Sequence, residues 1–195
     1  NVGFSGFTGS GYPKAVPVAL AAQIKAAHER GEAFMIGVFT GASTAPELDG
    51  ALAEVDGISY RMPYQSDPIM RNKINAGVSD YADIHLSHTA PQVRQGFWGN
   101  LDVAVVEVAA IKEDGTAIPS SSVGANTVYL EKADKIILEV NAWQSLDLEG
   151  MHDIYSMSLP GHNKPIPILA PGDRIGSTTY DIDWSRVAAV IETDA

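Results

Sequence analysis

The chain has 195 residues, of which 45% are hydrophobic, with 13 Lys and Arg against 24 Asp and Glu, a formal net charge of −11 and no cysteine. The missing cysteine excludes disulfides, thiolate metal sites and a cysteine nucleophile. The acidic balance argues against nucleic acid or anionic membranes as partners, since both require a basic surface. The length suits one globular domain of about 100 to 200 residues, and no apolar run approaches the ~20 residues that span a bilayer.

The first half of the chain alternates between predicted strands and helices. A strand at Val2–Phe4 precedes a helix over Val16–His28, whose apolar residues recur with helical spacing and which Gly31 ends. The apolar run Ala33–Phe39 predicts a strand buried on both faces. A second helix is expected to begin near Pro46, because proline suits the first helical turn.

The alternation continues to the end of the chain. Short helices are predicted over Pro68–Ala76, ended by Gly77, and over Asn126–Ala133, with Asn126 or Thr127 as the cap. The remaining predicted strands are Ile58–Met62, Ile84–Leu86, Val103–Val108, Ile136–Val140 and Val187–Ile191. We therefore expect a single α/β domain over residues 1–195, an open, mainly parallel sheet with helices on both faces. Ligands of such sheets bind at the carboxyl ends of strands, so the loops there are candidate sites.

The first such loop, Gly3–Pro13, is rich in glycine. Glycine permits positive φ and close backbone approach, so the amides of this loop could converge on an anion or an oxyanion. The spacing fits neither the dinucleotide pattern G-x-G-x-x-G nor the Walker pattern G-x-x-x-x-G-K-[ST], which argues against nicotinamide enzymes and P-loop NTPases. A turn that needs glycine for steric reasons alone is an equally good interpretation.

A second candidate loop, Thr40–Thr44, follows the predicted strand Ala33–Phe39. Its hydroxyl groups and amides could hold a carboxylate without any formal charge. The alternative is that Ser43 or Thr44 caps the helix that follows, and one hydroxyl could serve both purposes.

Other polar residues are weaker candidates. Glu107 and Glu139 lie within apolar strands, where a carboxylate needs a partner, and we interpret both as structural rather than nucleophilic. Asp49 is predicted on a helix surface. His85 and His88 fall on opposite faces of an extended segment, and we expect no metal site. Three aromatic residues are expected in the core or at an interface: Trp98, Trp143 and Tyr155.

A family resemblance covers nearly the whole chain, from Val2 to the last predicted strand. Gly6–Pro13, which reads GFTGSGYP, resembles the glycine-rich signature near the amino terminus of the family I coenzyme A transferases, although Ser5 stands where many members have glycine. Further segments resemble the acetyl-CoA hydrolase/transferase branch, and within it the succinyl-CoA:acetate and propionyl-CoA:succinate transferases: Thr40–Thr44, Pro46–Gly50, Met70–Asn75, Pro119–Gly124 and Glu139–Gln144.

The resemblance implies a ping-pong transfer of CoA between short-chain acids such as acetate, succinate or propionate, through a glutamyl-CoA thioester. CoA is then a substrate, and no permanently bound cofactor is expected. The family's nucleophilic glutamate lies in a Ser-Glu segment of the second half of the polypeptide, and this chain contains no Ser-Glu dipeptide. We therefore expect the amino-terminal half of a two-domain enzyme, with no catalytic residue in this chain and no activity on its own. The −11 charge implies that the CoA phosphates are held mainly elsewhere.

The resemblance also implies a binding site and partners. The substrate-binding residues that it implies are Gly6, Phe7, Thr8, Gly9, Gly11, Ser43 and Thr44. The expected partners are an acyl-CoA, a short-chain carboxylate, the carboxy-terminal domain and a second copy in a homodimer, and we expect a soluble, cytoplasmic protein that binds neither nucleic acid nor membranes. The alternatives are an acetyl-CoA hydrolase with the same site, a non-catalytic docking domain and, more distantly, a sugar-phosphate isomerase.

Overall fold

The computed structural model describes residues 1–156 and 158–195, and within them it forms one eight-stranded sheet. The strand order is β10-β9-β7-β1-β3-β5-β6, with β8 beside β7, and all neighbours are parallel except β7 and β8. The strands of this sheet are β1 (Val2–Phe4), β3 (Ile36–Phe39), β5 (Ile58–Met62), β6 (Asp80–Tyr81), β7 (Val103–Ile111), β8 (Ala117–Pro119), β9 (Lys135–Asn141) and β10 (Val187–Thr193). The predicted open, mainly parallel sheet is confirmed.

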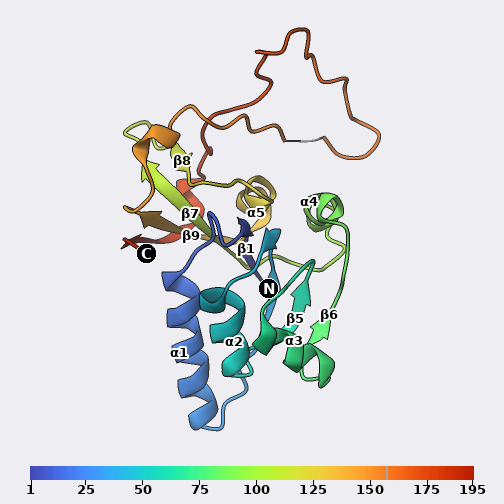
Figure 1. The fold of residues 1–195 in the computed structure, drawn as a ribbon, viewed down its shortest axis with the longest axis vertical. Coiled ribbons are helices and arrows are strands. Elements are labelled where there is room, and N and C mark those ends of the chain that lie inside the picture. Colours follow the sequence, from blue (N-terminus) through green and yellow to red (C-terminus); the bar gives the residue numbers. More distant parts are fainter. Residues whose placement is uncertain (157) are drawn as a thin grey trace.

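Helices cover both faces of this sheet, as predicted (Figure 1). They are α1 (Ala15–Glu29), α2 (Ala51–Glu54), α3 (Pro68–Asn75), α4 (Leu86–Arg94) and α5 (Asn126–Lys132). A π-helical turn, Pro46–Gly50, leads into α2, and short 3₁₀ turns form at Leu146–Leu148 and Trp184–Arg186. None of the helices in the described ranges has the length and apolar character needed to cross a bilayer.

Two buried clusters show how the layers pack. Helices α1, α2 and α3 enclose one cluster against the sheet, with Phe4, Ile24 and Leu52 at its centre. Helices α4 and α5 enclose the other cluster on the opposite face, around Tyr129 and Leu138. Burial of these apolar side chains is the main force that holds the three layers together.

The chain reverses its direction across the sheet beside β1. From β1 it adds β3, β5 and β6 on one side, and it then returns to place β7 and β9 on the other side of β1. Such a reversal separates the loops that leave neighbouring strands and opens a crevice at their carboxyl ends, where ligands of α/β sheets bind. The glycine-rich loop leaves β1 at this point.

Two predicted local features are wrong. Ile84–Leu86 is not a strand: α4 begins at Leu86, because Thr89 and Val93 four residues apart bury one helical face, and Asp80–Tyr81 pairs with β5 as the edge strand instead. Helix α5 has no side-chain cap at its start, because Asn126 is buried and donates from Nδ2 to the Tyr180 hydroxyl oxygen at 3.3 Å.

Candidate functional site

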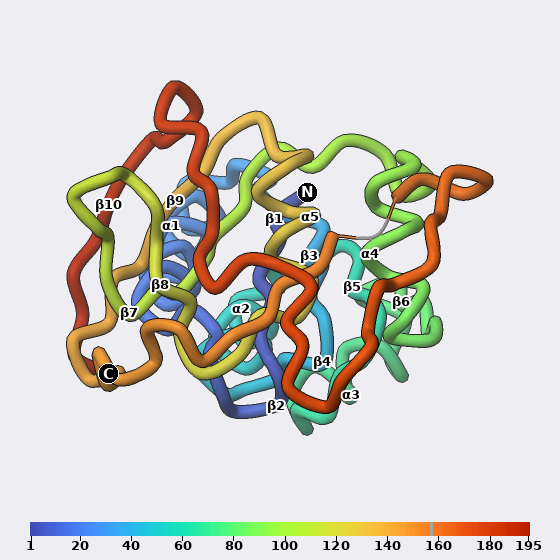
Figure 2. Tube along the Cα trace, turned by 90° about the horizontal axis from the view of Figure 1, so that it is seen from above, coloured from blue at the N-terminus to red at the C-terminus, as the bar shows by residue number. Residues whose placement is uncertain are grey.

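The glycine-rich loop and the Thr40–Thr44 loop lie side by side at the carboxyl ends of β1 and β3. Strand β2 (Phe7–Thr8) pairs in parallel with β4 (Ala42–Ser43), with Phe7 opposite Ala42 and Thr8 opposite Ser43. Figure 2, which views the molecule from above these ends, shows β2 and β4 together at one side of the large sheet. The structure therefore brings Phe7, Thr8 and Ser43 together.

The tip of the glycine-rich loop is a tight turn. Phe7 and Ser10 exchange backbone hydrogen bonds of 2.9 and 3.0 Å, so the intervening residues Thr8 and Gly9 form the turn. Thr8 has a φ of 48°, a left-handed conformation that is costly for a β-branched residue. Phe7 is 60% exposed, and Thr8 and Gly9 are also exposed. The loop therefore presents an apolar ring and a strained threonine to solvent.

A third segment, residues 119–125, packs against the same loop. The Ser10 and Ser121 hydroxyl oxygens lie 2.7 Å apart, and the Ser122 hydroxyl donates to the Ser10 carbonyl oxygen at 3.0 Å. The Ala125 amide donates to the Ser5 hydroxyl oxygen at 2.7 Å. This segment was predicted only through the family resemblance, because serines in an irregular connection carry no periodic signal.

Two glycines make the contact between these segments possible. A Cβ atom on Gly11 would lie 2.4 Å from Ser122 Oγ, and one on Gly124 would lie 2.3 Å from Ser5 Oγ. Both residues also have positive φ, 64° and 52°. By contrast, a Cβ atom on Gly9 would meet no heavy atom within 4 Å. Gly11 and Gly124 are therefore needed for steric reasons, whereas Gly9 is not.

Ser43 and Thr44 hold the second loop in place. Ser43 is fully buried, and its hydroxyl donates to the Phe4 carbonyl oxygen of β1 at 3.0 Å. The Thr44 hydroxyl oxygen accepts a hydrogen bond from the Ser66 amide at 3.1 Å. Neither side chain caps the following helical turn, whose preceding residue is Ala45, so the predicted capping role is wrong.

A buried arginine, which was not predicted from the sequence, holds the Thr40–Thr44 loop through hydrogen bonds. Arg61 of β5 is fully buried, and its Nε donates to Asp49 Oδ1 at 2.7 Å. Its Nη1 donates to Thr40 Oγ1 at 2.8 Å, and its Nη2 donates to the Ser43 carbonyl oxygen at 3.0 Å. Asp49 is itself fully buried, so its predicted position on a helix surface is wrong. The Arg61 guanidinium stabilises the Asp49 carboxylate in the protein interior, because a buried charge needs a partner.

Two buried glutamates fix the far end of the glycine-rich loop, where α1 begins. Glu139 of β9 accepts hydrogen bonds from the amides of Lys14, Ala15 and Val16 at 2.6 to 3.0 Å. This carboxylate satisfies the free amides at the positive end of the helix dipole. Glu107 of β7 pairs with the Lys14 ammonium at 2.6 Å. The structural interpretation of Glu107 and Glu139 is supported.

The amino-acid sequence matches a known protein family. Residues 1–171 match the family described as the acetyl-CoA hydrolase/transferase N-terminal domain. The chain belongs to this family. As a member of the acetyl-CoA hydrolase/transferase family it is 42% identical over 193 residues to the succinyl-CoA:acetate CoA-transferase of Clostridium kluyveri, covering 99% of the chain and 35% of that protein.

Other relatives in the acetyl-CoA hydrolase/transferase family differ in the activity that their names state. The propanoyl-CoA:succinate CoA transferase of Escherichia coli is 37% identical, with 99% of the chain and 39% of that protein covered. The acetyl-CoA hydrolase of Schizosaccharomyces pombe is 36% identical, with 99% and 38% covered. The chain thus spans 35% to 39% of the length of these relatives.

Solved structures support the fold of this family member. RipA from Yersinia pestis superimposes with a TM-score of 0.60 at 17% identity, over 100% of the chain and 38% of that structure. Glutaconate coenzyme A-transferase from Acidaminococcus fermentans gives 0.54 at 13% identity, over 72% of the chain and 61% of that structure. At these identities the likeness shows the shared α/β fold.

The histidines and tryptophans lie only partly where the sequence predicts them. His85 precedes α4 and His88 lies in its first turn, with their rings 5.3 Å apart, so the extended segment with opposite faces is wrong. Trp98 stacks on Tyr60 in the core, as predicted, whereas Trp143 is largely exposed and is not a core residue. Among the residues that the structure describes, no three His, Asp or Glu side chains are grouped to hold a metal ion.

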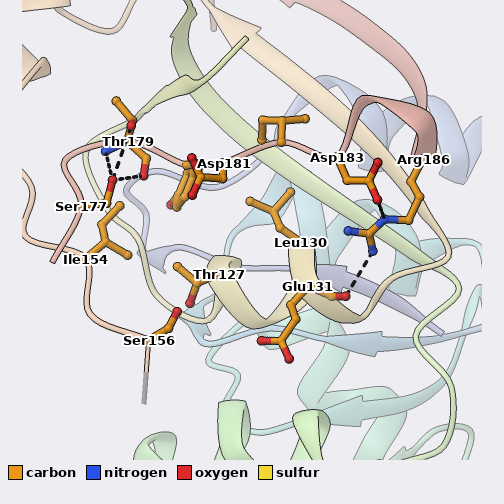
Figure 3. A pocket seen from close by; sticks show the side chains of 12 residues that line it. Thr127, Leu130, Glu131, Ile154, Ser156, Ser177, Thr179, Asp181, Asp183 and Arg186 are labelled. Atoms are coloured by element: carbon orange, nitrogen blue, oxygen red, sulfur yellow. Dashed lines mark hydrogen bonds and ion pairs between the residues drawn. The ribbon is translucent and has the colours of Figure 1, made fainter. Parts of the chain in front are cut away.

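A hollow of about 420 Å³ lies between α5 and the segment that leads to β10 (Figure 3). Glu131, Asp181 and Asp183 give it an acidic lining. Its cation, Arg186, donates to Asp183 Oδ2 at 2.8 Å and to the Glu131 carbonyl oxygen at 3.2 Å. This lining disfavours a polyanion such as CoA, because carboxylates repel phosphate groups and the guanidinium is already engaged.

Proposed function

We propose that this chain forms the amino-terminal domain of an acyl-CoA:carboxylate CoA-transferase and supplies one wall of its active site. The observation that carries the proposal is the parallel pairing of β2 with β4, which aligns the glycine-rich loop with the Thr40–Thr44 loop. Both loops lie at the carboxyl ends of strands beside the topological reversal, where this sheet class binds ligands. Membership in the acetyl-CoA hydrolase/transferase family supplies the reaction class.

The proposed reaction proceeds through covalent intermediates on a glutamate of the carboxy-terminal half. That carboxylate attacks the acyl-CoA thioester, forming an acyl-glutamyl anhydride and releasing the CoA thiolate. The thiolate attacks the glutamyl carbonyl carbon, so the donor acid leaves and a glutamyl-CoA thioester remains. The acceptor carboxylate then attacks the glutamyl carbonyl carbon and displaces the thiolate, and a second anhydride forms. The thiolate attacks the acceptor's carbonyl carbon in this anhydride, so the new acyl-CoA forms and the glutamate carboxylate is regenerated. Every intermediate retains an activated thioester or anhydride, so the exchange needs no external energy source.

This chain contributes positioning and exclusion of water. In the proposal, the exposed residues Phe7, Thr8 and Gly9 contact the acyl substrate, with Gly6, Gly11, Ser43 and Thr44 shaping the wall behind them. The Phe7 ring shields the intermediates from water, because hydrolysis of an anhydride or thioester would waste the transferred group. With a net charge of −11, the chain contributes amides and shape, and the other half holds most of the CoA phosphates.

Hydrolysis is the second candidate activity, because several relatives are named acetyl-CoA hydrolases. In that reaction water takes the place of the acceptor carboxylate, and free CoA and the acid are released. A homodimer and a cytoplasmic location belong to the same proposal. The isolated 195-residue chain would then act only as a docking domain, without catalysis.

The test uses the full-length parent, meaning the polypeptide that continues beyond Ala195. Succinyl-CoA is incubated with acetate or propionate, and both the new acyl-CoA and the free CoA are measured by chromatography. Transfer that exceeds CoA release supports the transferase, and release without transfer supports the hydrolase. Acyl exchange by the isolated chain, or no reaction with any acyl-CoA by the full-length parent, would overturn the proposal.

One matched pair of variants tests the wall itself. Phe7→Ala in the full-length parent should lower kcat/KM for transfer about tenfold, because one misplaced or missing contact to the acyl group weakens transition-state binding. Phe97→Ala removes another exposed aromatic ring, beyond α4, and should leave kcat/KM unchanged. Equal effects of the two substitutions would contradict a role for the glycine-rich loop.

A further inference from the structure

A long arm, residues 158–176, leaves the domain from a firmly anchored base. Ile154 and Ser177 exchange two backbone hydrogen bonds of 2.7 and 2.9 Å across the base. The Arg174 guanidinium donates to the Gly150 and His152 carbonyl oxygens at 2.6 and 2.8 Å. A Cβ atom on Gly176 would lie 2.0 Å from the Ile154 carbonyl oxygen, so the two sides of the base meet in direct backbone contact. Loops of this length without secondary structure are uncommon unless they serve a function.

The tip of this arm is apolar and exposed. Leu169 is 93% exposed and Ile168 is 59% exposed, and Ile166 beside them is also exposed. Four prolines restrict the arm to extended conformations: Pro160, Pro165, Pro167 and Pro171. Grouped aliphatic side chains on a protein surface mark interaction sites, because leaving them in water forgoes the free energy of burial.

The tip is also held in a defined shape. Asp173 Oδ2 accepts hydrogen bonds from the Leu169 and Ala170 amides at 2.7 and 2.9 Å, and the Asp173 amide donates to the Ala170 carbonyl oxygen at 3.1 Å. These bonds are local to the arm, and they fix the backbone on which Leu169 projects outward. A pre-ordered tip binds with a smaller loss of conformational entropy than a flexible one.

The arm rises on the side of the sheet that carries the candidate site. Figure 1 shows its far part standing beyond the carboxyl ends of the strands. Its first residues, 158–160, line a hollow with α4 and α5. In Figure 2, seen from above, the arm extends over the part of the molecule that contains β4, α3 and α4. A protein surface that covers the tip therefore also faces the loops of the candidate site.

We propose that the tip, residues 166–169, packs on an apolar surface of the carboxy-terminal half of the same polypeptide and thereby helps to close the cleft over the candidate site. This inference rests on the proposed function, in which that half completes the enzyme. The chain spans only 35% to 39% of its relatives, and the family match extends through residue 171, so the tip belongs to the shared domain.

The first experiment maps the contact. Benzoylphenylalanine is placed at position 169 of the full-length parent, and the protein is irradiated and digested for mass spectrometry, with mixed isotope labels to separate crosslinks within one chain from those between two. Crosslinks to peptides beyond Ala195 of the same chain are expected. Crosslinks between two copies, or to residues 1–195 alone, or none at all, would overturn the proposal.

The second experiment measures protection and uses a matched control. Amide hydrogen exchange in residues 164–171 should be about tenfold slower in the full-length parent than in the isolated chain, and Leu169→Asp should remove that protection. The same substitution in the isolated chain should change Tm by no more than about 2 °C, because the side chain is exposed there. Phe97→Asp, at an exposed apolar position beyond α4, should leave the protection of the arm intact.

Transfer activity is assayed on the same preparations so that the two proposals fail separately. If the arm is protected but the protein has no acyl-CoA activity, the proposed function is wrong and the proposed docking of the arm stands. If the protein has transfer activity but the arm is neither protected nor crosslinked, the proposed docking is wrong and the proposed function stands.

Discussion

Replacing Arg61 by methionine removes the guanidinium that ties β5 to the Thr40–Thr44 loop. Arg61 donates to both Asp49 oxygens, to Thr40 Oγ1 and to the Ser43 carbonyl oxygen, at 2.7 to 3.2 Å, and both members of the ion pair are fully buried. Asp49 then remains as an unpaired carboxylate in the protein interior. Breaking a buried pair in this way costs about 3 to 5 kcal/mol.

For a domain of this size, that loss lowers Tm by about 6 to 20 °C, at 2 to 4 °C for each kcal/mol. Urea and thermal denaturation of the 195-residue chain, followed by circular dichroism, measure the change. Lys73→Met breaks the partly exposed pair with Asp56 and serves as the control, with an expected cost of at most about 1 kcal/mol.

A double variant separates stability from positioning. Asp49→Leu combined with Arg61→Met removes both charges, and most of the lost stability should return, because apolar replacement of a buried pair is often neutral. The Thr40 and Ser43 contacts stay lost, so the full-length parent with both substitutions should have a lower transfer activity than the unsubstituted protein. The reasoning is refuted if Arg61→Met costs less than about 1 kcal/mol, or if the two single losses simply add in the double variant.

Three further predictions concern the same framework. Gly124→Ala should destabilise the chain by at least about 1 kcal/mol, through its positive φ and its contact with Ser5, whereas Gly9→Ala should change Tm little; equal Tm shifts would contradict the steric argument. Glu139→Gln should cost about 1 to 2 kcal/mol in urea denaturation, because a neutral side chain interacts weakly with the start of α1, and an unchanged midpoint would disprove the capping. Hydrogen bonds from the Leu169 and Ala170 amides lower the pKa of Asp173. They therefore stabilise the tip fully above the ordinary carboxyl pKa of 3.8, and this stabilisation is lost as the pH falls through the lowered pKa of Asp173. NMR shifts of those amides that stay constant from pH 6 to about 2.5 would contradict this.

The sequence predicted the layers well, because they rest on apolar patterns. The Val- and Ile-rich runs at β7 and β9 and the helical spacing in α1 lead directly to a parallel sheet with crossover helices. The prediction failed at Ile84–Leu86, where three residues are too few to distinguish a strand from the entry to a helix.

The candidate site was only partly predictable. Both loops follow from the rule that ligands bind at the carboxyl ends of strands, but the two-residue strands β2 and β4 that join them are too short for any periodic signal. Arg61 and Asp49 were missed for a different reason. A charged residue within a strand or a helical turn is expected on the surface, and only the tertiary pairing of the two shows that both are buried.

The capping of α1 by Glu139 has a consequence for synthesis on the ribosome. The amide of Lys14 and its acceptor are 125 residues apart in sequence, and the Ser5 hydroxyl and the Ala125 amide are 120 apart. Contacts between such distant residues form late, because a long loop must close before they can stabilise anything. The nascent glycine-rich loop therefore stays without its final shape until the segment that contains Glu139 has emerged.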